Sequence, residues 1–225
     1  MSELRQQRLA ILRSAGLYLV TDERVGREAR RAVVEQALAA GVRVVQLRDK
    51  HALGRALLEE ARALAALCRA HGALLIVNDR ADIAVAAEAD GVHVGQEDLP
   101  PAAARQIVGP DRLVGVSAST VEEAVEAERG GADYVGFGAI FPTPTKADAE
   151  YAGPQLLAEA RRHVHIPLVA IGGITLHNLP EVLAAGPDLV AVVSAVFGAD
   201  DPAAATRALL AALRQRPGAS AATAR

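Results

Sequence analysis

Short apolar runs alternate with amphipathic stretches along almost the whole chain. Eight runs rich in Val, Ile and Leu are predicted strands: Leu17–Val20, Val42–Leu47, Leu74–Val77, Gly91–Val94, Leu113–Val116, Tyr134–Phe137, Pro167–Ile171 and Leu189–Val193. These runs are nearly continuous in hydrophobicity instead of alternating with polar residues. That pattern is typical of parallel strands that are buried on both faces.

The stretches between the strands have the spacing of amphipathic helices. In Arg27–Ala40 and Leu53–His71, apolar residues recur every three or four positions with charged residues opposite them. Thr120 and Glu123 have the spacing of a capping box that opens another helix. A further helix is predicted at Glu3–Ser14, ahead of the first strand.

The order of these elements predicts the fold class. Eight strand–loop–helix units within 225 residues favour an α/β protein with a closed (β/α)8 TIM barrel and an extra N-terminal helix over a doubly wound sheet. We expect residues 1–215 to form a single catalytic domain. Residues 216–225, rich in Ala, Ser and Gly, are expected to be a disordered tail.

Composition narrows the class of protein further. The chain is 51% hydrophobic and 23% charged, as in an ordinary globular protein, and its net charge of −3 argues against a nucleic-acid partner. No signal-like N-terminus is present, and no apolar run approaches the roughly 20 residues that a membrane span needs. The single Cys68 cannot form an internal disulfide and lies in an Ala/Leu helical pattern. We therefore expect no membrane partner and a cytoplasmic location.

Four polar clusters lie where predicted strands end. They are Gln46-Leu47-Arg48-Asp49-Lys50, Asn78-Asp79-Arg80, Gln96-Glu97-Asp98 and Thr143-Pro144-Thr145-Lys146. Because the carboxyl ends of parallel strands meet on one face, these clusters are expected to form a single site. Cations, carboxylates and hydroxyls gathered there indicate an enzyme acting on phosphorylated small molecules.

The second strand supplies the candidate phosphate-binding cations. If Val44 packs inside the barrel, Gln46 and Arg48 project from the same face into its mouth. Arg48 offers a planar fork to phosphate oxygens and Lys50 a mobile point charge. The alternative is a solvated loop of mixed charge, since Asp49 lies between them.

Asp79 and Asp98 follow neighbouring strands and are candidate metal ligands. Mg²⁺ prefers a few carboxylates together with substrate phosphates and water, so such a pair suits a magnesium–diphosphate site. Both residues could instead cap the helices that follow, and spacing alone does not separate Asp98 from Glu97. The basic residues on the adjacent strand favour the metal hypothesis.

Later strands add three more candidates. Ser117 ends the fifth predicted strand with a hydroxyl, although a cap or turn role is almost equally compatible. The long segment from Thr143 to Gly153 suits a lid or clamp. Gly172-Gly173 after the seventh strand and a short helix, Ser194–Phe197, after the eighth together predict a phosphate site; a plain turn and helix cap is the alternative.

Several common kinds of active site are disfavoured. His93 could face the mouth, but a hydrogen-bonded structural histidine is the commoner case. The sequence contains no HExxH motif, His/Cys zinc pattern or Ser-His-Asp arrangement that stands out. The glycine pairs do not form a dinucleotide fingerprint after the first strand, which disfavours NAD.

Taken in order, these motifs resemble the thiamine phosphate synthase family. The resemblance runs from Tyr18-Leu19-Val20-Thr21-Asp22 to Ser194 and includes the four clusters, Gly91-Val92-His93-Val94-Gly95, Gly115-Val116-Ser117 and Gly172-Gly173-Ile174. Each motif is weak alone, but their common register is specific. The resemblance implies a transferase that joins 4-amino-2-methyl-5-hydroxymethylpyrimidine diphosphate to 4-methyl-5-(2-phosphoethyl)thiazole, or its carboxylated form, with Mg²⁺ as cofactor.

The resemblance also implies residue roles. By motif match, the pyrimidine diphosphate would contact Gln46, Arg48, Lys50, Asn78 and Lys146; Mg²⁺ would be held by Asp79 and Asp98; Ser117 would stabilise the pyrimidine side; and the thiazole phosphate would be held by Thr143, Thr145, Gly173, Val193 and Ser194. Arg48, Lys50, Ser117 and Lys146 would be the catalytic set. No side-chain nucleophile is needed, because the family is thought to release pyrophosphate before the thiazole nitrogen attacks.

Other functions remain possible on the same fold. A thiazole tautomerase would lack parts of the diphosphate and metal set, and no such loss is visible. A phosphosugar isomerase would need an acid–base pair, and a non-catalytic regulator would only bind a phosphorylated ligand. The expected partners are small-molecule substrates, and the sequence permits a homo-oligomer.

Overall fold

The computed structural model describes residues 1–143 and 151–215, and it has the predicted (β/α)8 TIM-barrel fold. Eight parallel strands pair in sequence order and close on themselves. The strands are β1 (Leu17–Val20), β2 (Val44–Leu47), β3 (Leu74–Asn78), β4 (Gly91–Val94), β5 (Leu113–Ala118), β6 (Tyr134–Phe137), β7 (Leu168–Ile171) and β8 (Leu189–Val192).

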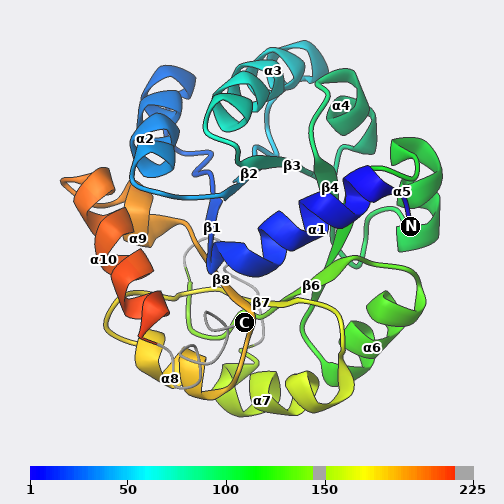
Figure 1. The fold of residues 1–225 in the computed structure, drawn as a ribbon, viewed down its shortest axis with the longest axis vertical. Coiled ribbons are helices and arrows are strands. Elements are labelled where there is room, and N and C mark those ends of the chain that lie inside the picture. Colours follow the sequence, from blue (N-terminus) through cyan, green and yellow to red (C-terminus); the bar gives the residue numbers. More distant parts are fainter. Residues whose placement is uncertain (144–150, 216–225) are drawn as a thin grey trace.

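Helices surround this barrel on the outside, as Figure 1 shows. They are α2 (Arg27–Ala39), α3 (Gly54–Ala70), α4 (Ala81–Ala86), α5 (Pro101–Val108), α6 (Val121–Arg129), α7 (Gly153–His163), α8 (Leu179–Ala184), α9 (Ser194–Phe197) and α10 (Pro202–Arg214). Thr120 caps α6 through the predicted capping box. Cys68 is buried in α3, where burial raises its pKa to about 12.

Some predicted strand ends were wrong by two residues. β2 begins at Val44 instead of Val42, because its pairing with β1 starts at Tyr18 and Val44. β5 continues through Ser117 to Ala118, since both residues pair with β6. Ser117 therefore lies within a strand and not at its end, so the paired backbone fixes the direction of its side chain.

The strands are apolar throughout because both of their faces are buried. Leu19 and Val45 belong to the layer between the sheet and the outer helices, whereas Tyr18 and Val44 belong to the cluster inside the barrel. Successive strand residues point to opposite faces, so a continuous apolar run fills both layers.

The extra N-terminal helix, α1 (Glu3–Ala15), closes the end of the barrel where the strands begin. Leu9 and Leu12 pack into the interior cluster, and Figure 1 shows α1 crossing the barrel opening. Arg5 pairs with Asp133, just before β6, and Arg8 pairs with Asp90, just before β4. Helix α1 does not cover the other end of the barrel, where the strands finish and where the functional site is predicted.

None of the described helices is long and apolar enough to cross a membrane. The tail predicted at 216–225 lies outside the described residues.

Candidate active site

One cavity opens at the carboxyl ends of the strands and collects nearly all of the predicted site residues. Its lining includes Gln46, Arg48, Lys50, Asn78, Asp79, Asp98, Ser117, Thr143, Gly173, Val193 and Ser194. Thr145 and Lys146 lie outside the described residues, as does most of the segment predicted to be a lid. The structure thus brings the predicted residues together, while their individual roles stay predictions.

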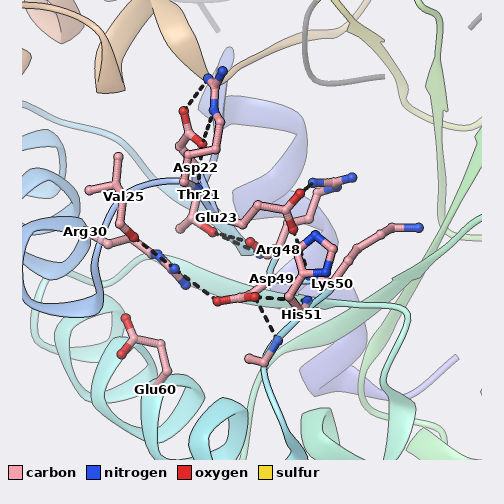
Figure 2. Close-up of polar contacts among 12 residues, drawn as sticks. Thr21, Asp22, Glu23, Val25, Arg30, Arg48, Asp49, Lys50, His51 and Glu60 are labelled. Carbon is pink, nitrogen blue, oxygen red and sulfur yellow. Dashed lines mark hydrogen bonds and ion pairs between the residues drawn. The ribbon is translucent and has the colours of Figure 1, made fainter. Parts of the chain in front are cut away.

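Residues after β1 hold the Arg48 side chain and the backbone of Lys50 in place. Thr21 Oγ1 accepts a hydrogen bond from the Arg48 N–H at 2.9 Å and donates to the Arg48 carbonyl at 3.1 Å. Glu23 accepts from Arg48 Nη1 at 2.8 Å and from the Lys50 N–H at 2.8 Å (Figure 2). Burial acts to raise the pKa of the Glu23 carboxyl, but the bonds from Lys50 and Arg48 outweigh it and lower that pKa below its ordinary value. Arg48 therefore lies in an ordered ion pair and not in a loose loop.

The two predicted metal ligands lie in direct contact. Burial and the neighbouring carboxylate of Asp98 raise the pKa of Asp79, while Lys50 opposes this effect from 3.5 Å. Asp79 also adopts a left-handed backbone, with φ of 60°, which is uncommon for a non-glycine residue. Two carboxylates that repel each other beside a single lysine form a region where a divalent cation would be stabilised.

The helix-capping alternative for these aspartates was wrong. α4 begins after Arg80 and α5 after Pro100, and neither is capped by a side chain of the described residues. Asp98 instead accepts a hydrogen bond from the Gly95 N–H at 2.8 Å, within its own loop. Glu97 is exposed and does not line the cavity, so the structure separates the two acids that spacing could not.

A buried hydrogen-bond chain crosses the barrel beneath the cavity. Gln46 Nε2 donates to the Tyr18 hydroxyl at 2.8 Å, and the Tyr18 and Tyr134 hydroxyls lie 2.9 Å apart. The Tyr134 hydroxyl is hydrogen-bonded to His93 Nδ1 at 3.1 Å, and His93 Nε2 is hydrogen-bonded to Ser117 Oγ at 2.8 Å. Burial raises the pKa of both tyrosines, so they stay neutral.

The hydrogen bonds between Gln46 and Ser117 all run in one direction when the Gln46 side-chain nitrogen is the first donor. If His93 is neutral with its ring proton on Nε2, Tyr18 donates to Tyr134, Tyr134 donates to Nδ1 of His93, and Nε2 donates to Ser117. The Ser117 hydroxyl proton remains able to point into the cavity. His93 is thus the hydrogen-bonded structural histidine that the sequence favoured, and it also lines the cavity.

The glycine pair after β7 is required by contact with the segment after β6. Gly172 and Gly173 have φ of 100° and 64°. A Cβ on Gly173 would lie 2.6 Å from the Pro142 carbonyl oxygen, and one on Gly172 would lie 2.6 Å from Ala139 Cβ. The close approach therefore packs two loops together and brings Thr143 and Gly173 into one wall of the cavity.

Sequence reasoning missed Glu23 and the two tyrosines. The rule that polar residues cluster after strands applies equally to Thr21-Asp22-Glu23 after β1, so Glu23 could have been found. Tyr18 and Tyr134 gave no comparable signal, because an aromatic residue in a strand is usually packing.

Comparison with known proteins agrees with this geometry. Residues 17–196 match the family model described as thiamine monophosphate synthase. A thiamine-phosphate synthase of Chloroflexus aurantiacus is 53% identical over 195 residues, covering 86% of this chain and 90% of that protein. One of Methanospirillum hungatei is 50% identical, covering 85% and 94%. The solved structure of a thiamine phosphate pyrophosphorylase from Pyrococcus furiosus has a TM-score of 0.85 and 42% identity, covering 92% of this chain and all of that one.

These matches confirm the resemblance seen in the sequence motifs. The family match covers residues 17–196, which include every strand that contributes to the cavity, and the relatives align with most of the chain. The chain therefore belongs to the thiamine monophosphate synthase family, whose members are transferase enzymes.

Proposed function

We propose that this barrel joins 4-amino-2-methyl-5-hydroxymethylpyrimidine diphosphate to 4-methyl-5-(2-phosphoethyl)thiazole, or its carboxylated form, and releases thiamine phosphate and pyrophosphate, with loss of CO2 as well when the carboxylated thiazole reacts. Family membership supports the reaction. One observation carries its assignment to these residues: two cations, two contacting carboxylates and a glycine loop line the same cavity.

The diphosphate would bind where β2 and β3 end. Arg48 offers a guanidinium and Lys50 an ammonium group, and Asn78 adds an amide on the same wall. Gln46 would contact the pyrimidine diphosphate deeper in the barrel, where its side chain is buried. Lys146 is assigned to the same substrate by motif match alone.

Asp79 and Asp98 would hold Mg²⁺ against the diphosphate. Their donor set fits this ion, since Mg²⁺ takes one or two carboxylates and completes its shell with phosphate and water. Among residues 1–143 and 151–215 no group of three or more His, Cys, Asp or Glu side chains could hold a metal, so an all-protein cage is not the kind of site found there. When bound, Mg²⁺ would withdraw negative charge from the diphosphate oxygens.

The reaction needs no side-chain nucleophile. The bond between the pyrimidine methylene carbon and the diphosphate oxygen breaks with both electrons leaving on oxygen, and the thiazole nitrogen then donates its lone pair to the methylene cation. Arg48, Lys50 and Lys146 would stabilise the charge that builds on the departing pyrophosphate. Ser117, hydrogen-bonded to His93, would stabilise the pyrimidine side.

The thiazole phosphate would bind where β7 and β8 end. Gly173, Val193 and Ser194 line that side of the cavity, and Thr143 faces it from the segment after β6. Thr145 is assigned there by motif match. Holding the thiazole nitrogen close to the methylene carbon would supply much of the rate enhancement, because orientation removes the entropic cost of a bimolecular step.

The direct test is to incubate the purified protein with both substrates and Mg²⁺ and to measure thiamine phosphate and pyrophosphate in equal amounts. Omitting either substrate, or chelating the metal, should abolish both products. A thiazole tautomerase, a phosphosugar isomerase or a ligand-binding regulator would give no coupled product. If the protein is folded and binds both substrates but forms no thiamine phosphate, the proposal is refuted.

A further inference from the structure

Asp49 lies between the two cavity cations but faces the opposite way. Arg48 and Lys50 line the cavity, whereas Asp49 does not and forms an ion pair with Arg30 of α2. Arg30 Nη2 donates to Asp49 Oδ2 at 3.0 Å and also to the Val25 carbonyl oxygen at 3.1 Å (Figure 2). The Arg30 side chain does not line the cavity, and the residue is only 2% exposed.

The Asp49 carboxylate also stabilises the turn formed by the residues that follow it, His51 and Ala52. Asp49 Oδ1 accepts hydrogen bonds from the His51 N–H at 3.2 Å and the Ala52 N–H at 2.9 Å, ahead of α3. One side chain thus sets the path of the backbone that carries both cations. Any shift of Asp49 would move Arg48 on one side and Lys50 on the other.

Arg30 also ties this segment to the loop that faces it. Val25 and Glu23 belong to the same loop after β1, and Glu23 accepts hydrogen bonds from the Arg48 side chain and from the Lys50 N–H. The single Nη2 atom therefore bridges two loops, one that supplies both cations and one that supplies the counter-charge of Arg48.

The choice of a guanidinium here is not explained by stability. Arg30 Nε and Nη1 are buried and have no hydrogen-bond partner among the described residues. Buried N–H groups without partners are costly, and a buried ion pair is often no more stabilising than apolar side chains of the same size. A cation kept at such a position is better explained by what it holds in place.

We propose that Arg30 is a positioning residue for the diphosphate substrate, acting through Asp49 and Val25 to fix Arg48 and Lys50 at the cavity. This inference rests on the proposed function. It assigns Arg30 no contact with substrate, so its loss should act on the diphosphate end and leave the thiazole phosphate end unchanged.

The neighbouring residue supplies a matched control. Arg31 pairs with Glu60 of α3 through Nε and Nη2 at 2.9 and 2.7 Å, and Glu60 is 1% exposed. This pair also joins α2 to a buried carboxylate, but neither Arg31 nor Glu60 forms a hydrogen bond or ion pair with residues 48–52 in the described part of the chain. Arg31→Met therefore breaks a comparable ion pair without loosening the cavity.

The experiment compares Arg30→Met, Arg30→Lys and Arg31→Met with the wild type. We measure kcat, the KM of each substrate, and the affinity for pyrophosphate in the presence of Mg²⁺, with circular dichroism and the unfolding temperature as checks of folding. Arg30→Met should raise the KM of the pyrimidine diphosphate and weaken pyrophosphate binding by about tenfold or more, as expected for disturbed charged hydrogen bonds. The KM of the thiazole phosphate should change less than about twofold.

Arg30→Lys should reverse part of the rise in the diphosphate KM caused by Arg30→Met, because it keeps a positive charge facing Asp49 although its ammonium ends one bond short of the position of Nη2. Arg31→Met should lower the unfolding temperature but leave both KM values unchanged. If Arg30→Met does not fold, Asp49→Asn takes its place, since the amide oxygen can still accept from His51 and Ala52 while the charge facing Arg30 is lost.

Three results would overturn the inference. They are an Arg30→Met enzyme that matches Arg31→Met in both KM values, equal losses for both substrates, and a folded Arg30→Lys enzyme as poor as Arg30→Met. If Asp49→Asn is used instead, an unchanged KM for the pyrimidine diphosphate would also overturn the inference. Failure of the proposed function would be visible separately, because the wild type itself would then form no thiamine phosphate.

Discussion

Arg48 faces the cavity with its charge already paired. Its Nη1 donates to Glu23, which also holds the backbone of Lys50, so the guanidinium is ordered before substrate arrives. A diphosphate then adds to an existing ion pair and does not have to order a mobile side chain. The cost of ordering a long side chain is therefore met during folding, not during binding.

Arg48→Met should weaken binding of the diphosphate substrate much more than of the thiazole phosphate. Loss of a charged hydrogen bond is worth about 1.5–3 kcal/mol, which predicts a rise of about 10- to 100-fold in the KM of the pyrimidine diphosphate. Steady-state kinetics with each substrate varied in turn measure this. The matched control is Arg80→Met, which removes an arginine paired with Asp82 outside the cavity lining; equal effects of the two substitutions would contradict the assignment.

Asp98→Asn should separate metal binding from stability. The amide oxygen can still accept the Gly95 N–H, while the carboxylate repulsion that adds to burial in raising the Asp79 pKa is removed. Without metal, the unfolding temperature should stay equal or rise. In the wild type, Mg²⁺ with pyrophosphate should raise that temperature by mass action, and in Asp98→Asn this shift should vanish together with turnover. A variant that keeps the ligand-induced shift would show that Asp98 does not hold the ion.

At the residue scale, the sequence predicted the side chains that face the mouth but not those that hold them. Gln46, Arg48 and Asp79 were found because strand periodicity and strand ends are local signals. The contact of Arg30 with Asp49 joins α2 to the segment after β2, and no spacing rule connects those positions. Such supports depend on how two loops meet in space.

Glycines decide how the elements meet around the cavity. A Cβ on Gly115 would lie 2.1 Å from Tyr134 Cζ, and one on Gly136 would lie 3.1 Å from His93 Cε1. These two strand glycines therefore make room for the rings that connect Gln46 to Ser117. The sequence did not predict this packing of rings against glycines, because a glycine in a strand gives no information on which distant side chain lies next to it.

Gly173→Ala should damage both folding and the thiazole end of the site. The left-handed backbone costs an alanine about 1 kcal/mol, and its Cβ would also clash with the Pro142 carbonyl at 2.6 Å. The control is Gly131→Ala, which has a similar φ of 88° but no atom within 4 Å of the added Cβ. Chemical denaturation should show a larger loss for Gly173→Ala, and only this variant should raise the KM of the thiazole phosphate. Equal losses in both variants would mean that the clash is relieved without moving the loop.

On the scale of the whole molecule, the two ends of the barrel have different tasks. The carboxyl end carries the cavity, and α1 fills the amino end with Leu9 and Leu12. The eight-unit pattern predicted the barrel and its extra helix, because both follow from local periodicity. The end that the helix covers follows from chain connectivity, because only Gly16 separates α1 from the start of β1. The pattern did not predict the ion pairs that hold the helix across the opening, such as Arg5 with Asp133, 128 positions apart.

Asp133 connects three parts of the amino end, so it tests whether stability and catalysis are separable. It is 4% exposed, pairs with Arg5 and Arg105, and accepts a hydrogen bond from the Val114 N–H at 2.8 Å. Asp133→Asn leaves two partly buried guanidinium groups without their counter-charge, which should lower the free energy of unfolding by roughly 3–5 kcal/mol.

The same variant should keep the wild-type KM for both substrates at temperatures where it remains folded, because Asp133 lies at the end of the barrel opposite the cavity. Denaturant unfolding and steady-state kinetics on one preparation measure the two quantities together. Glu159→Gln is the control, since its exposed pairs with Arg162 and His163 should be worth less than about 1 kcal/mol. A change in either KM without a loss of stability would mean that the amino end takes part in shaping the cavity, and the division between the two ends would have to be abandoned.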